Sequence, residues 1–87
     1  MGSYTFNYCA IENLTLPETI QSIGSYTFQY CKALKNLRVR ATTPPSIGSY
    51  VFRYANDFYN IVVHHDYVVR YREAWSSYSG HIIADND

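Results

Sequence analysis

A nine-residue phrase is written three times in this chain, and no other sequence feature limits the possible folds as strongly. It reads MGSYTFNYC at residues 1–9, IGSYTFQYC at 23–31 and IGSYVFRYA at 47–55. The glycines of successive copies are 22 and 24 residues apart. Repeats of this length are typical of proteins that stack one small unit on the next. Because such a unit cannot bury its apolar face alone, each copy must lie on its neighbour and present the same shape.

A second phrase follows each copy of the first: IENLTL at 11–16, LKNLRV at 34–39 and FYNIVV at 58–63. The L-x-L pattern predicts a short strand, because alternate residues of a strand point to opposite faces. Stacked units would place these strands about 4.8 Å apart in a parallel sheet. The outward positions would be Thr15, Arg38 and Val62. Two buried columns are expected, one of Phe6, Phe28 and Phe52 and one of Leu14, Leu37 and Ile61.

The nine-residue phrase itself is expected to form a short helical turn, although its Tyr and Phe residues at two-residue spacing would also suit a strand. After Val63 the repetition stops, and residues 68–75 show helical spacing with Asp66 as the expected N-cap. Residues 81–85 would supply a last strand. The sequence therefore predicts one domain over residues 1–87, with repeats at about 1–22, 23–46 and 47–63 and a C-terminal cap at 64–87.

A family likeness is carried by the pattern I-G-x-x-x-F-x-x-C at residues 23–31 and by the spacing Leu34-x-x-Leu37-x-Val39. The chain resembles the BspA-like leucine-rich repeats of bacterial cell-surface proteins, and residues 64–87 are similar to that family's C-terminal cap, with His64 in place of an expected proline. The resemblance implies an α/β repeat solenoid, a short leucine-rich-repeat stack with a parallel β-sheet, helical turns, and a C-terminal capping helix and strand. It also implies the C-terminal end of a longer exported protein, at the cell surface or secreted.

Several functional classes find no support in the composition. The formal net charge is zero, so the broad electrostatic attraction that nucleic acid binding requires is missing. No apolar run approaches the roughly 20 residues that span a bilayer, so membrane insertion is not expected. The chain has no G-x-S-x-G elbow, no paired carboxylates poised for acid–base work and no glycine-rich phosphate loop. We therefore expect a protein that is not an enzyme and that needs no cofactor.

Two small groups of reactive residues are given structural interpretations. Cys9 and Cys31 share one repeat position with Ala55, which favours buried free thiols over a disulfide between neighbouring repeats. The triplet His64, His65 and Asp66 offers metal-ligating side chains. Adjacent histidines in an extended segment point to opposite faces, which is poor geometry for one ion. No metal is expected there.

The tyrosines are the most informative surface feature. Residues four apart share a face of a helical turn, so six tyrosines are expected in two parallel columns on one flank. They would either cover the phenylalanine column, with their hydroxyls in water, or form a recognition surface. Arg38 is a further candidate, on the outer sheet face beside an in-register asparagine column that would form an amide ladder or a polar ligand site. The candidate ligand-binding residues are Tyr4, Tyr8, Tyr26, Tyr30, Tyr50, Tyr54 and Arg38.

These features predict a non-enzymatic binding or structural module of a bacterial cell-surface protein, mediating protein–protein interaction or adhesion. The alternative is a carbohydrate-binding module that uses the tyrosine-rich flank, and a third interpretation is a spacer that binds nothing. The ligand would be a protein or a glycan. Because the first repeat has no cap, its edge could pair with another chain, so a homodimer through residues 1–16 is expected.

Overall fold

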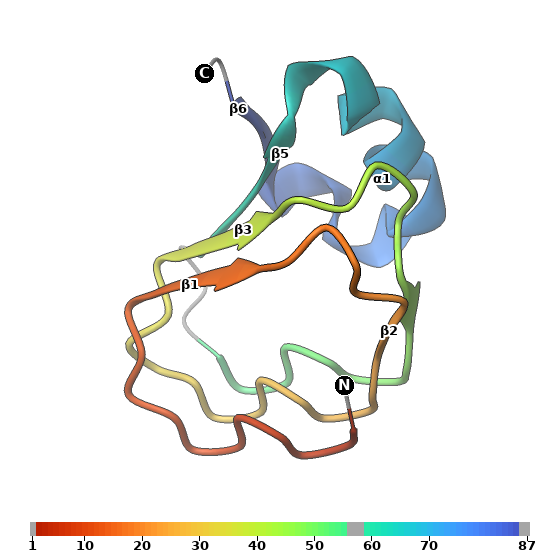
Figure 1. Cartoon of the computed structure of the whole chain (residues 1–87). Helices are drawn as coiled ribbons and strands as arrows, with labels where there is room; N and C mark the ends of the chain where they lie inside the picture. The colour runs from red at the N-terminus through yellow and green to blue at the C-terminus, as the bar shows by residue number, and fades with distance from the viewer. Residues whose placement is uncertain (1, 56–58, 86–87) are drawn as a thin grey trace.

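The computed structural model describes residues 2–55 and 59–85, and Figure 1 shows three similar loops of chain lying side by side. We call these loops the first, second and third rungs; they contain Gly2, Gly24 and Gly48. Each rung begins with a turn segment, drawn at the bottom of Figure 1, and continues into a strand of the main sheet. The main strands are β1 (Asn13–Leu16), β3 (Asn36–Val39), β5 (Asn60–His64) and β6 (Ile82–Asp85).

The main sheet is parallel, with the strand order β1-β3-β5-β6. Its register places Leu14 opposite Leu37 and Leu37 opposite Ile61, which confirms the predicted column. A second, two-stranded parallel sheet joins β2 (Ser22–Ile23) and β4 (Ser46–Ile47). Repeats, parallel strands and a short helix together make a repeat fold.

The predicted phenylalanine column is also confirmed, although Phe6, in the first rung, is only partly buried. The ring of Phe28 stacks on those of Phe6 and Phe52, with centroid distances of 5.5 and 5.3 Å. Tyr59 continues the stack at 4.5 Å from Phe52, and Tyr78 meets Phe52 edge-on. Burying one such side chain contributes about 1.5–3 kcal/mol, so this column is a large part of the core.

The turn segments are not helical, and that expectation was wrong. Residues 3–8, 25–30 and 49–54 each form consecutive tight turns. In the first rung these turns are closed by Asn7 N–H donating to the Tyr4 carbonyl and Cys9 N–H donating to the Phe6 carbonyl. The tyrosines have φ between 55 and 61°. A residue in the left-handed region ends a right-handed turn at once, so no helix can form. This conformation is shared by Tyr4, Tyr8, Tyr26, Tyr30, Tyr50 and Tyr54.

The turn segments of neighbouring rungs are joined by backbone–backbone hydrogen bonds that all run in one direction, which we call the N–H ladder. Tyr4, Phe6 and Tyr8 donate their N–H groups to the carbonyls of residues 25, 27 and 29, over 2.9–3.1 Å. Tyr26, Phe28 and Tyr30 do the same toward residues 49, 51 and 53, over 2.8–3.1 Å. In an ordinary parallel sheet each strand both donates to and accepts from its neighbour. In the backbone–backbone bonds between turn segments, each rung only donates toward the next one.

Glycine is required where the rungs meet. A Cβ atom on Gly24 would lie 2.4 Å from the backbone nitrogen of Ser3, and one on Gly48 would lie 2.4 Å from that of Ser25. Neither distance leaves room for a side chain. The repeated glycine therefore permits the close backbone approach on which the N–H ladder depends.

The cap begins with the 3-10 helix η1 (His65–Tyr67) and the helix α1 (Val68–Ala74), followed by the 3-10 helix η2 (Ser76–His81). The predicted capping helix and last strand are both confirmed. Asp66 is not the N-cap, however, because the 3-10 turn already starts at His65 and His64 precedes it. The His64 Nδ1 atom accepts a hydrogen bond from Asp66 N–H over 3.1 Å.

Two buried aromatic residues attach the cap to the connection between the second and third rungs. The Tyr71 hydroxyl donates to the Ala41 carbonyl over 2.6 Å, and the Trp75 Nε1–H donates to the Pro45 carbonyl over 3.0 Å. The two rings meet edge-on at 5.1 Å. Both polar atoms are therefore satisfied where water cannot reach them.

The outer face of the sheet departs from the prediction at Val62, which is buried although its strand position points outward. Its cross-strand neighbours are Arg38 on β3 and Ile83 on β6. The Arg38 guanidinium forms an ion pair with the Asp85 carboxylate of β6. The strand that lies between β3 and β6 is β5, so this pair covers Val62.

Replacing Gly48 by alanine should destabilise the fold, because the new Cβ would collide with the backbone of Ser25. We expect a loss of about 1–3 kcal/mol in the free energy of unfolding, the usual range for overpacking. Gly80→Ala is the matched control, since nothing lies within 4 Å of its Cβ position. Urea denaturation followed by circular dichroism measures both variants, and equal stability of the two would contradict the close approach.

The Tyr71 hydroxyl should make stability fall at high pH. Burial raises the pKa of Tyr71 to about 12, against an ordinary value of 10.0. Below pH 10 both states keep the proton. Between about pH 10 and pH 12 the unfolded chain loses it first, so the folded state is progressively destabilised. Absorbance titration should show one of the ten tyrosines ionising late, and Tyr71→Phe should abolish that late step. A wild-type titration without it would contradict the burial.

Candidate functional site

Six tyrosines are brought together on the turn segments as two columns, as the sequence predicted, although the backbone differs from the helical turn expected. The first column stacks Tyr26 between Tyr4 and Tyr50, with ring centroids 5.1 and 5.7 Å apart. The second column has centroid distances of 4.5 and 5.0 Å and consists of Tyr8, Tyr30 and Tyr54. We call them the tyrosine columns. Their end residues are well exposed, and Tyr8 reaches 69%.

The left-handed backbone of these tyrosines has an energetic cost. For a residue with a Cβ atom it amounts to about 1–2 kcal/mol, and Gly or Asn would fit better. Two interactions offset this cost in the first two rungs. The tyrosine N–H joins the N–H ladder, and the ring stacks on the equivalent ring of the next rung.

Stacking determines which parts of the rings a ligand can reach. Within each column the faces of neighbouring rings cover one another. At the third rung, the Arg53 guanidinium lies over the rings of Tyr50 and Tyr54, at 5.2 and 4.8 Å from their centroids. The columns therefore offer mainly ring edges and hydroxyl groups, while Tyr4 and Tyr8 each have one ring face that none of the three described rungs covers.

Arg53 is a site residue that the sequence reasoning missed. Its Nη2 atom donates to the Tyr54 hydroxyl over 3.0 Å, and this hydrogen bond raises the pKa of Arg53 above its ordinary value. Equivalent positions of the earlier rungs hold the neutral residues Asn7 and Gln29. This change from a neutral amide to a cation is the sequence feature that could have identified Arg53 as a site residue. It places a positive charge at one end of the tyrosine columns.

Arg38 lies on the main sheet and not among the tyrosines, and its charge is paired with Asp85. It borders an open depression of about 390 Å³ over β1, β3 and β5. Beside it, the asparagine column forms the predicted amide ladder. Asn36 donates to Asn13 over 2.9 Å and Asn60 donates to Asn36 over 3.4 Å. These contacts show structural roles for the sheet face.

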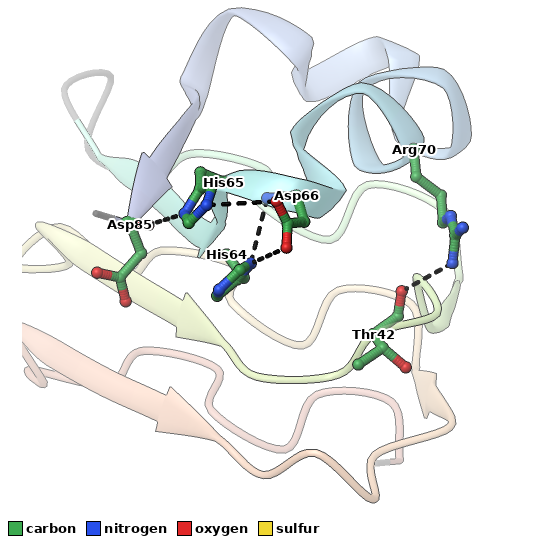
Figure 2. A network of polar contacts seen from close by, with 6 residues as sticks. All are labelled: Thr42, His64, His65, Asp66, Arg70 and Asp85. Atoms are coloured by element: carbon green, nitrogen blue, oxygen red, sulfur yellow. Dashed lines mark hydrogen bonds and ion pairs between the residues drawn. The ribbon is translucent and has the colours of Figure 1, made fainter. Parts of the chain in front are cut away.

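Figure 2 shows His64, His65 and Asp66 close together at the start of the cap. The two imidazole rings stack at 4.3 Å, and the Asp66 carboxylate lies 3.6 and 3.3 Å from their nitrogens. The expectation that they point to opposite faces was wrong, because the strand ends at His64 and a 3-10 turn begins at His65. The Asp66 N–H occupies the His64 Nδ1 lone pair, and His65 Nδ1 lies 3.3 Å from the Asp85 carbonyl, to which it can donate. The absence of a metal stays a prediction.

The two cysteines are free thiols, as expected. Cys31 is buried and its Sγ donates to the Phe6 carbonyl over 2.9 Å. Burial raises the pKa of this thiol above its ordinary value. A thiol that stays protonated in the core is a poor nucleophile, so Cys31 acts as a packing residue.

None of the helices within residues 2–55 and 59–85 is long and apolar enough to pass through a membrane. A comparison with protein families matched residues 1–82 to the model described as BspA type leucine-rich repeat region (6 copies). No curated protein and no solved structure matched the chain. The family match covers nearly the whole length and agrees with the rung pattern seen in the structure. The chain therefore belongs to the BspA-type leucine-rich repeat family.

Proposed function

We propose that this chain is a non-enzymatic binding module of a bacterial cell-surface protein and that it contacts a partner protein through the tyrosine columns. The observation that carries the proposal is the left-handed conformation of six tyrosines, most of them well exposed. Backbone needs alone would favour Gly or Asn at such positions. Tyrosine nevertheless occupies both left-handed positions of every rung, and its conformational cost indicates that the side chain itself has a role.

The exposed chemistry of the columns suits a protein partner. Tyrosine offers a large contact area with little side-chain entropy to lose, and its hydroxyl can donate or accept a hydrogen bond. Stacking on the neighbouring rung orders the rings further before a partner arrives. A preorganised surface of this kind lowers the entropic cost of binding.

The carbohydrate-binding alternative is less well supported. A sugar stacks on the face of an aromatic ring, and most ring faces in the columns are already covered. Uncovered faces are found at Tyr4 and Tyr8, in the first rung. A glycan ligand would therefore be restricted to that end of the columns.

Membership of the BspA-type family supports a place at the cell surface, or secretion, and a curved solenoid. A non-enzymatic role is supported by the side chains themselves. The Cys31 thiol is buried and protonated, and the exposed histidines lie beside Asp66 and Tyr67. The proposal includes no cofactor.

Replacing one whole column tests the proposal without straining the backbone. In the variant Tyr8→Asn, Tyr30→Asn, Tyr54→Asn, each new residue tolerates positive φ. We expect the N–H ladder to form and binding to fall at least tenfold, because the contact area is lost. The measurement is an array of purified extracellular proteins, probed in parallel with a glycan array, with affinities of the hits from surface plasmon resonance.

The control is Val69→Asn, which removes an exposed apolar side chain from α1 and should leave the hits unchanged. Single variants Tyr26→Ala and Tyr50→Ala should weaken the same hits through the other column. Protein hits that survive loss of both columns would disprove the site. Hits confined to the glycan array would favour the carbohydrate alternative.

We also propose a homodimer, but only through part of the predicted surface at residues 1–16. The carbonyls of Ser3, Thr5 and Asn7 occupy the acceptor positions of the N–H ladder on the side away from the second rung. Two first rungs meeting there would oppose rows of carbonyls, which repel. The edge strand β1 can pair, because residues 13 and 15 direct their N–H and C=O groups away from β3 while Glu12 and Leu16 face it. Unpaired edges of this kind are templates for another chain.

Light scattering at increasing concentration should show a monomer–dimer equilibrium. Thr15→Pro removes an edge N–H group and should shift the mass toward the monomer without loss of an internal hydrogen bond. Circular dichroism checks that the variant is folded. A wild-type chain that stays monomeric at millimolar concentration would refute the dimer.

A further inference from the structure

The N–H ladder ends with three donors that have no following rung. Because every rung donates toward the next, the N–H groups of Tyr50, Phe52 and Tyr54 point beyond the third rung. Within residues 2–55 and 59–85, no atom accepts a hydrogen bond from any of the three. Backbone N–H groups that point to one side of a turn and lack an acceptor can bind an anion.

These donors lie beside a cleft of about 290 Å³. One side of the cleft comes from Tyr50 and residues 52–55 of the third rung, and the other side comes from the cap and the residue before β5. Tyr59, Tyr78 and His81 line that second side. His81 stacks on Tyr59 at 4.0 Å, and its Nδ1 atom lies 3.0 Å from the Tyr59 carbonyl, to which it can donate. The cleft therefore has backbone donors on one side and flat aromatic rings on the other.

Among the residues that the structure describes, the cleft has one permanently charged lining residue, and it is a cation. Arg53 is among its lining residues, and no aspartate or glutamate is present among the described ones. The hydrogen bond to Tyr54 and the contacts with two tyrosine rings position the guanidinium at the cleft. One guanidinium and three neutral donors match a singly charged anion better than a doubly charged one.

We propose that this cleft binds the carboxylate of an organic acid, with its oxygens on the Arg53 guanidinium and on one or two neighbouring N–H groups of the row formed by Tyr50, Phe52 and Tyr54. The body of the ligand lies against the rings of Tyr59 and Tyr78. This site goes beyond the protein-binding function of the tyrosine columns, because it uses backbone donors and a cation at the end of the ladder. A chain that bound no partner protein would still have it.

Nuclear magnetic resonance with sodium benzoate, a carboxylate with a flat apolar body, tests the proposal. The amide signals of residues 50, 52 and 54 should shift and saturate, while those of Phe28 and Tyr30, which are bonded within the N–H ladder, should not move. Sodium chloride at equal ionic strength is the reference. Acetate should bind more weakly than benzoate, and phosphate should bind more weakly than either carboxylate at equal ionic strength. Tighter phosphate binding would overturn the carboxylate assignment.

Arg53→Gln is a well-matched variant, because the second rung has Gln29 at the same position. We expect it to weaken benzoate binding about tenfold, the effect of losing one charge-assisted hydrogen bond. Arg40→Gln removes an equal charge from a residue outside the cleft and should leave binding unchanged. Equal affinity of the wild type and Arg53→Gln would overturn the proposal.

Hydrogen exchange on the free protein tests the donors independently of any ligand. The amides of Tyr50, Phe52 and Tyr54 should exchange at least tenfold faster than those of Tyr26, Phe28 and Tyr30, which occupy the same positions one rung earlier and are hydrogen-bonded. Equal protection in the two rungs would mean that the three donors are already occupied within the chain, and the proposed site would not exist.

Discussion

The close approach of one rung to the next at Gly24 and Gly48 is the contact on which the rest of the structure depends. It brings backbones together where any side chain would collide. Strands of a sheet lie about 4.8 Å apart, and the stacked rings of the turn segments have centroids 4.5–5.7 Å apart. One repeat distance thus serves the sheet, the N–H ladder and the aromatic columns together. A larger separation anywhere would weaken all three.

The N–H ladder gives the stack a direction that a parallel sheet alone lacks. In the turn segments, the N–H groups of alternate residues point toward the same neighbour, so the two ends of the stack differ chemically. Carbonyls are left at the first rung, and N–H donors are left at the third. The proposed functions follow this asymmetry, because a carbonyl row discourages head-to-head contact whereas a donor row beside Arg53 attracts an anion. Between the two ends, each tyrosine column offers its hydroxyls and ring edges.

The sequence predicted those contacts between neighbouring rungs that follow from the repetition alone. Aligning the copies pairs Phe28 with Phe6 and Leu37 with Leu14, and any stack of identical units must preserve those pairs. The turn conformation could not be found this way, because tyrosine is unfavourable at positive φ and the conformation is stabilised only by the neighbouring rung. The stacking of His64 on His65 was not predicted, because the extended segment was expected to continue whereas the strand ends at His64. Arg53 was missed because Tyr59 and His81, which complete its cleft, come from other parts of the chain.

The cap explains why a binding cleft exists at this end of the stack. It completes the main sheet, because β6 pairs with β5 and Asp85 reaches Arg38. It also covers the core, with Tyr71 and Trp75 bonded to the connection between the second and third rungs. Across the turn segment it supplies aromatic side chains, and within residues 59–85 no backbone carbonyl accepts from the last donors of the N–H ladder. The apolar part of the stack is thereby closed while its hydrogen-bonding part stays open. A ligand with carboxylate oxygens and an apolar body can take the place that a further rung would fill.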